Sequence, residues 1–161
     1  MSVRPAEFRE ALARLAAHVS IVTGYDRDGR PRGFTASAVC SLSADPPLIL
    51  VCIARKAPSH EVFIRSSSFA VNVLRDSHQY LAERFATAGV DRFAGADFVT
   101  GPHAPHLPDA LCTLTCSTYE THPGGDHSIL VGRVEQVTTS NGEPLVYFHR
   151  RFCGLALAPT I

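Results

Sequence analysis

The sequence has no excess of either charge. Its Lys and Arg residues number 15, its Asp and Glu residues also number 15, and the isoelectric point is near 7.1. Proteins that bind nucleic acid or an anionic membrane surface through charge carry a basic excess or a basic patch. The composition therefore predicts neither a nucleic-acid partner nor a membrane-surface partner.

Long apolar runs are also missing. No segment of the sequence approaches the ~20 apolar residues that a membrane-spanning helix needs. The first residues carry Arg4, Glu7, Arg9 and Glu10, and they lack the apolar core of a secretory signal. We therefore expect a cytoplasmic location.

The motifs of two common nucleotide-binding folds are absent. No G-x-G-x-x-G follows an expected strand, and no G-x-x-x-x-G-K-[ST] occurs. A protein with this sequence that binds a nucleotide does so on another framework. A serine nucleophile elbow and a paired-carboxylate motif are missing too, so the sequence does not support hydrolysis.

Disulfides and metal sites lack support as well. The 5 cysteines are an odd number. Cys112 and Cys116, four residues apart on an expected strand, are too far apart for a disulfide, and the other three are isolated. This favours reduced thiols that act as small buried apolar groups. His103, His106 and His122 have no cysteine or carboxylate at a matching spacing, and zinc needs three or four ligands on a fixed frame. We therefore expect no metal.

The chain of 161 residues, with 45% hydrophobic residues, suits a single domain over residues 1–161. Strand-like segments follow one another with tight turns, rather than alternating with helices. This order favours a mainly β fold, an antiparallel barrel with peripheral helices. The patterns predict helices over 5–17, 58–65 and 76–88, and strands over 19–23, 32–40, 48–53, 69–74, 110–119, 129–137 and 144–149.

Three local patterns lead to more specific expectations. The turn over residues 26–31 predicts a hairpin between the first two strands, and Asn141-Gly142 predicts another before the last strand. The segment over residues 48–53 is apolar at every position, which predicts a strand covered on both faces. In the helix over residues 76–88, Leu81 and Phe85 are expected to face inward.

Small hydroxylated residues and a basic loop flank a double proline. The hydroxylated residues before Pro46-Pro47 are Thr35, Ser37 and Ser41. The basic loop, which follows the apolar strand, contains Arg55, Lys56 and Ser59. Small side chains allow a flat ring to approach the backbone, and cations with hydroxyl donors suit a phosphate. The pattern favours a phosphorylated flat cofactor over the alternatives, a solvent-facing strand and a solvated loop.

His127 follows two glycines and Asp126, which could orient its imidazole. A histidine there could bind a carboxamide, lie against a ring or supply a proton, and the alternative is a solvated loop residue. Arg150 and Arg151 could clamp a dinucleotide, cover a dimer seam or protect an edge strand from aggregation.

Taken together, these segments resemble the flavin reductase family of the FMN-binding split barrel, the short reductase components of two-component flavin monooxygenases. The resemblance runs from Phe8 to Phe152. The matching motifs, in order, are Gly33-Phe34-Thr35-Ala36-Ser37-Ala38, Ser41 to Leu48, Val51-Cys52-Ile53-Ala54, Phe69 to Leu74, Arg84-Phe85-Ala86, Asp91-Arg92-Phe93, Gly125-Asp126-His127, Gly132-Arg133-Val134 and Tyr147 to Phe152.

The resemblance implies a homodimer of split barrels that passes a hydride from NADH to FMN or FAD and supplies the reduced flavin to a partner monooxygenase. It also implies roles for individual residues. The isoalloxazine would be lined by Thr35, Ala36, Ser37 and Ala38 and flanked by Cys52 and Ala54. The phosphate would be held by Lys56 and Ser59, and the outer edge of the flavin would be bordered by Arg84, Phe85 and Phe93. The nicotinamide would meet His127, and NADH would be held in part by Arg151.

Two departures from the family pattern stand out. Ala38 replaces a frequent serine or threonine, and His18 replaces a glycine before the first strand. Two other functions use the same barrel: a flavin- or haem-binding protein without catalysis, and an oxidase of the pyridoxamine-phosphate type. The Gly125-Asp126-His127 motif and the turn over residues 43–47 favour the reductase. The choices between FMN and FAD, and between NADH and NADPH, stay open.

Overall fold

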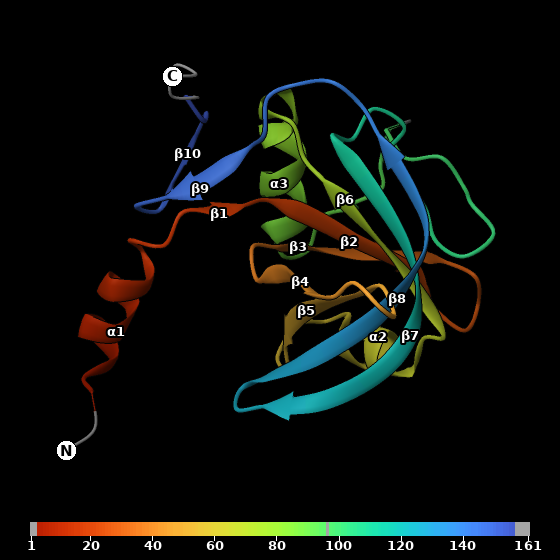
Figure 1. Ribbon diagram of the computed structural model, residues 1–161, viewed down its shortest axis with the longest axis horizontal. Coiled ribbons are helices and arrows are strands. Elements are labelled where there is room, and N and C mark those ends of the chain that lie inside the picture. The colour runs from red at the N-terminus through yellow and green to blue at the C-terminus, as the bar shows by residue number, and fades with distance from the viewer. Residues whose placement is uncertain (1–2, 96, 157–161) are drawn as a thin grey trace.

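The computed structural model describes residues 3–95 and 97–156. Within them, strands outnumber helices, as expected for a mainly β fold (Figure 1). The helices are α1 (Pro5–Leu12), α2 (His60–Arg65), η1 (Asp76–His78) and α3 (Gln79–Ala86). The strands are β1 (Ala17–His18), β2 (Ser20–Tyr25), β3 (Pro31–Ala36), β4 (Val39–Ser43), β5 (Leu48–Ala54), β6 (Ser68–Val73), β7 (Cys112–Gly124), β8 (His127–Thr139), β9 (Val146–Phe148) and β10 (Arg151–Cys153).

A seven-stranded antiparallel sheet forms the body of the molecule. Its strand order is β3-β2-β6-β7-β8-β5-β4. β3 and β4 follow each other in the chain, yet they lie at opposite ends of this order. The sheet therefore curls. The amide of Cys52 on β5 donates a hydrogen bond to the carbonyl of Ala38 (3.0 Å), which extends the β4–β5 pairing by one residue. This curled, open sheet is the split barrel that the sequence predicted.

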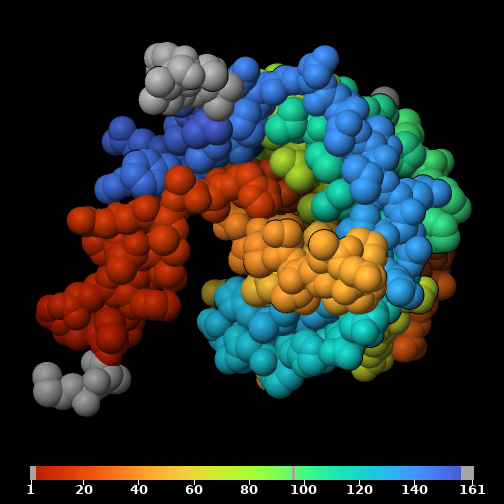
Figure 2. Space-filling model, viewed as in Figure 1, coloured from red at the N-terminus to blue at the C-terminus, as the bar shows by residue number. Residues whose placement is uncertain are grey.

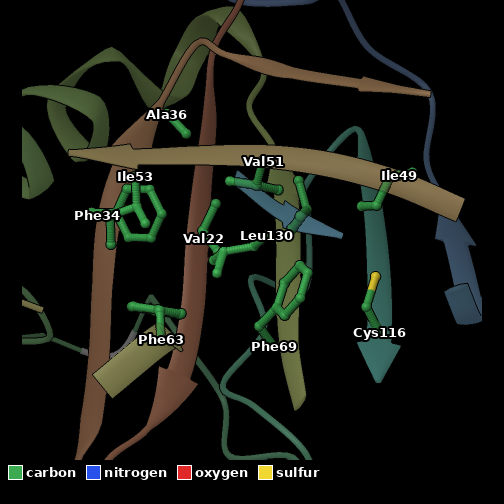
Figure 3. Packing of buried hydrophobic residues seen from close by; sticks show 11 residues of the cluster. Val22, Phe34, Ala36, Ile49, Val51, Ile53, Phe63, Phe69, Cys116 and Leu130 are labelled. Carbon is green, nitrogen blue, oxygen red and sulfur yellow. The ribbon is translucent and has the colours of Figure 1, made fainter. Parts of the chain in front are cut away.

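The inside of the curled sheet holds the main apolar core. Alternate residues of each strand point inward, because side chains change face at every position. Figure 3 shows Phe34, Phe63 and Phe69 among the aliphatic side chains of β2, β5 and β8. The rings of Phe34 and Phe63 meet edge to face with centroids 5.0 Å apart.

A second core lies outside the barrel, under α3. Leu81 and Phe85 on this helix are buried, as predicted, and they pack with Ile21 of β2 and with Leu74, which follows β6. The rings of Phe85 and Phe93 also meet edge to face, 5.0 Å apart. The hairpin predicted over residues 26–31 is confirmed, since β2 and β3 pair from Ser20↔Ala36 to Tyr25↔Pro31.

The strand predicted over residues 32–40 is wrong as a single strand. It is interrupted at Ser37-Ala38, between β3 and β4. Thr35 and Ser41 therefore lie on different strands, and they do not share one hydroxylated face. The physical reason is the curl of the sheet, because the chain has to leave one end of the strand order and enter the other.

The expectation that residues 48–53 are covered on both faces is also wrong for the single chain. Ile49, Val51 and Ile53 are buried, whereas Leu50 and Cys52 on the outer face are only partly buried. An apolar residue on the outer face contributes as much to the hydrophobicity of the strand as a buried one does. Composition alone therefore could not distinguish a strand covered on both faces from a strand covered on one.

The hairpin predicted at Asn141-Gly142 does not form. β9 leaves β8 and pairs with β1 and β10 in a separate three-stranded sheet. Buried Leu145 explains this course, because its amide donates to the carbonyl of Leu74 and its carbonyl accepts from the amide of Val19 (both 3.0 Å). The tight turn lies instead at His149 and Arg150, which both have positive φ.

α1 ends at Leu12, earlier than predicted, and residues 17–18 form β1. No residue of α1 is buried, and Phe8 and Leu12 are 55% and 46% exposed. Figure 2 shows α1 standing away from the barrel, with a hollow between them. Over residues 3–95 and 97–156, no helix is long and apolar enough to cross a membrane.

Gly132 on β8 allows two strands to pack closely against Phe69. A Cβ atom there would lie 2.5 Å from Cζ of Phe69 and 2.9 Å from Cβ of Cys116. We expect Gly132→Ala to lower the free energy of unfolding by about 1–3 kcal/mol, because both neighbours are fully buried. Urea denaturation measures this change. Gly154→Ala, where a Cβ meets nothing within 4 Å, should change it by less than about 0.5 kcal/mol; equal effects would contradict the packing argument.

Candidate functional site

A cavity of about 560 Å³ opens at the split of the barrel, between β3 and β5. It brings together residues that are far apart in the sequence. Most of the predicted cofactor residues line it: Thr35, Ala36, Ser37, Ala38, Cys52, Ala54, Lys56, Phe85 and His127. The sequence prediction thus named one continuous surface, although the structure alone shows why these segments meet.

Short side chains make one wall of this cavity nearly flat. Ala36, Ala38 and Ala54 contribute no more than a methyl group each, so a planar ring can approach the backbone there. The hydroxyl of Thr35 is already used, because it donates to the carbonyl of Ala82 on α3 (2.8 Å). That bond fixes β3 against α3, so Thr35 shapes the wall instead of offering a free hydroxyl.

Phe85 reaches the cavity because Gly33 leaves room for it. A Cβ at Gly33 would lie 2.6 Å from Cε1 of Phe85. The carbonyl of Gly33 accepts a hydrogen bond from Nη1 of Arg92 (2.8 Å), and the carbonyl of Thr87 accepts one from its Nη2 (3.3 Å). Gly33 therefore positions both a ring and a cation at the cavity.

Arg92 is a lining residue that the list of predicted site residues lacked. It borders both this cavity and an adjacent one of about 270 Å³. A signal was present in the sequence, since Arg92 lies in the Asp91-Arg92-Phe93 motif of the family resemblance. An arginine in a loop of polar and small residues is not otherwise distinguishable from a solvated one.

Ser59 and Phe93 border the adjacent cavity, next to Pro58 and Arg92. Ser59 is only 4% exposed, and its hydroxyl has no hydrogen-bond partner among the described residues. A buried hydroxyl without a partner costs free energy, so this position fits a ligand that accepts a hydrogen bond. Lys56 is exposed at the rim of the larger cavity. The set suits an anionic group.

His127 is not a free loop residue. It is the first residue of β8, and it pairs with Ala54 of β5 and with Gly124 of β7. Its Nδ1 lies 2.7 Å from Oδ1 of Asp126, and this hydrogen bond lowers the pKa of the Asp126 carboxyl. The charged carboxylate therefore persists to lower pH than usual and holds the imidazole at the mouth of the cavity.

Two predicted arginines lie outside the main cavity. Arg151 borders a neighbouring cavity of about 780 Å³, which shares Thr35 and Ser37 with the first. Arg84 lines none of these cavities, because its Nη1 binds the carboxylate of Asp97 (3.0 Å) and the carbonyl of Ala94 (2.8 Å). The role of Arg84 beside the flavin therefore stays a prediction.

The described part of the chain holds no cluster of three metal-ligating side chains. All five cysteines are free thiols. Burial raises the pKa of the Cys116 thiol to about 12, which makes it an unreactive core residue. Cys52 is the thiol that lines the cavity, and burial raises its pKa as well.

Comparison with known families and proteins is consistent with this geometry. Residues 12–156 match the flavin reductase like domain. The actinorhodin polyketide dimerase of Streptomyces coelicolor is 48% identical over 152 residues, which are 93% of this chain and 86% of that protein. An NADH:riboflavin 5'-phosphate oxidoreductase of Streptomyces pristinaespiralis is 39% identical over 155 residues, 94% of this chain and 88% of that protein.

Solved structures show the same fold. The NADH:FAD oxidoreductase of Streptomyces globisporus, in complex with NAD and FAD fragments, superposes with a TM-score of 0.88 at 32% identity. The similarity covers 99% of this chain and 98% of that one. The styrene monooxygenase flavin reductase of Pseudomonas putida matches with a TM-score of 0.85 at 26% identity, over 94% of this chain and 99% of that one.

Proposed function

The chain belongs to the flavin reductase family, and from this premise we propose that it is an NADH-dependent flavin reductase that supplies reduced flavin to a partner monooxygenase. FMN is the flavin that we propose, and residues 1–161 form one domain. The observation that carries the proposal is the cavity at the split, which is lined by small alanines and by His127. Ser59, whose hydroxyl has no hydrogen-bond partner among the described residues, borders the adjoining cavity.

The residues fit a phosphorylated flavin. The flavin and the nicotinamide supply the redox chemistry when bound, a hydride transfer between their rings. The protein supplies alignment, since Ala36, Ala38 and Ala54 allow a ring to lie against the backbone. Phe85 borders this wall on the side of α3.

Charge and hydrogen-bond donors gather beside this wall. Lys56 and Arg92 carry positive charge beside the wall, and Ser59 at the adjoining cavity has a buried hydroxyl with no hydrogen-bond partner among the described residues. These three groups suit the phosphate of FMN. His127 is assigned to the nicotinamide, and Arg151 to the rest of NADH, because the cavity of Arg151 adjoins the wall.

We also propose that the protein is a homodimer. The outer face of β5 carries partly exposed Leu50 and Cys52, and α1 exposes Phe8 and Leu12. A second copy would remove both apolar surfaces from water. Because Cys52 also lines the cavity, this arrangement puts the flavin close to the subunit interface. A cytoplasmic location belongs to the same proposal, since five free thiols are typical of reducing compartments.

One assay separates the reductase from its two alternatives. NADH oxidation that depends on added free flavin supports the reductase. A tightly held coloured cofactor without turnover would indicate a carrier or sensor, and oxidation of pyridoxamine phosphate would indicate the oxidase. Reduced flavin must leave the protein to reach a monooxygenase, so the reductase should bind flavin loosely.

The phosphate role of Lys56 and Ser59 is tested by comparing flavins. We expect Lys56→Ala and Ser59→Ala each to raise the KM for FMN by about tenfold, because each removes a hydrogen bond to a charged group. The KM for riboflavin, which lacks the phosphate, should change by less than about twofold. Steady-state NADH oxidation measures both constants. Arg30→Ala, at an exposed turn, serves as a control for loss of positive charge; parallel losses with both flavins would refute the assignment.

The role of His127 is tested by a difference between the two substrates. His127→Ala should raise the KM for NADH by about tenfold and the KM for FMN by less than about threefold, because the side chain is assigned to the nicotinamide alone. His122→Ala is the matched control, since His122 also pairs with a carboxylate, Glu120, on the same hairpin. An unchanged KM for NADH in His127→Ala would contradict the assignment.

The proposed interface is tested by a charge on β5. Leu50→Asp should convert the dimer to a monomer in sedimentation-velocity experiments, because an aspartate cannot be buried there without a partner. Val137→Asp alters an apolar residue of β8 that is 59% exposed, and it should leave the dimer intact. A wild-type protein that sediments as a monomer at micromolar concentration would rule out the homodimer.

A further inference from the structure

A buried hydrogen bond, outside the cavity, links the segment that holds Ser59 to the segment that holds His127. His60 begins α2 and is 8% exposed, and Ser128 is the second residue of β8 and is 7% exposed. Nε2 of His60 and Oγ of Ser128 lie 2.9 Å apart and share this bond. Neither residue lines the cavity. Their bond therefore acts on the site only through neighbouring residues.

The neighbours of this pair are the residues assigned to the two substrates. Ser59 directly precedes His60, and His127 directly precedes Ser128. The amide of His60 donates to the carbonyl of Ala57 (2.9 Å), which holds the loop after β5 in a tight turn. The bond between His60 and Ser128 thus ties the phosphate loop to the start of the strand that carries His127.

A second connection runs along the same path. The amide of Arg55 donates to the carbonyl of Asp126 (2.9 Å), so the loop and the β7–β8 turn already touch on the solvent side. That contact is exposed, whereas the contact of His60 with Ser128 is buried and excludes water. A buried bond is the stiffer of the two, because no water can replace either partner without opening the packing.

We propose that His60 and Ser128 are positioning residues, and that they couple occupation of the flavin phosphate site to the placement of His127 against the nicotinamide. This inference rests on the proposed function. A bound phosphate fixes the positions of Lys56 and Ser59, and through them the position of the adjacent His60. The hydrogen bond from His60 then fixes Ser128. Because Ser128 directly follows His127 on β8, the backbone of His127 is held in place as well. The flavin phosphate should therefore improve the use of NADH, which it does not touch.

The experiment compares the KM for NADH with saturating FMN and with saturating riboflavin. In the wild type we expect the KM for NADH to be about fivefold lower with FMN, at the lower end of ordinary coupling between sites. Ser128→Ala removes the hydroxyl and should reduce this ratio to less than about twofold. Ser128→Thr keeps the hydroxyl and should retain the wild-type ratio.

A control distinguishes positioning from stability. His78 is another buried histidine, and its Nε2 lies 3.2 Å from Oδ2 of Asp109, away from the cavity. His78→Gln should lower thermal stability and leave the FMN-to-riboflavin ratio unchanged. If Ser128→Ala does not fold, His60→Asn, whose shorter side chain falls short of β8, provides the same comparison.

Two results would overturn the inference: a wild-type ratio near one, or an undiminished ratio in Ser128→Ala or His60→Asn. Failure of the proposed function looks different, because the wild type would then show no flavin-dependent NADH oxidation with either flavin.

Discussion

The crossing of the chain at Ser37-Ala38 is the constraint on which the site depends. It connects β3 and β4, which occupy opposite ends of a seven-stranded order. Two residues can span those ends only if the sheet curls until the ends approach each other. The same curl encloses the main core on one side and opens the cavity on the other.

The site is built on backbone and small residues, and larger groups are placed around it by close packing. Gly33 admits Phe85 and offers its carbonyl to Arg92, so one residue without a side chain positions two others. The hydroxyl of Thr35 is bonded to α3, which keeps that helix against the sheet. A shallow wall of this kind suits a flavin that binds, is reduced and leaves.

Several features could be predicted because their causes are local. The β2–β3 hairpin follows from its turn residues, and the inward direction of Leu81 and Phe85 follows from helical spacing. The family motifs predicted most of the cavity lining. The errors arose where tertiary contacts decided the outcome: Leu145 bonds to the backbone of Val19 and Leu74 and draws the chain away from a hairpin at Asn141-Gly142.

The sequence by itself determined which residues have the chemistry for a phosphorylated flat ring, and that successive side chains of a strand occupy opposite faces. Alternation along a strand is a local property and needs no knowledge of neighbours. Only the tertiary structure decided that Ala38, Ala54 and His127 meet, that the buried Ser59 hydroxyl has no partner within residues 3–95 and 97–156, and that Arg92 reaches the cavity. Those outcomes depend on strand order and curl, which are set by pairings between segments far apart in the chain.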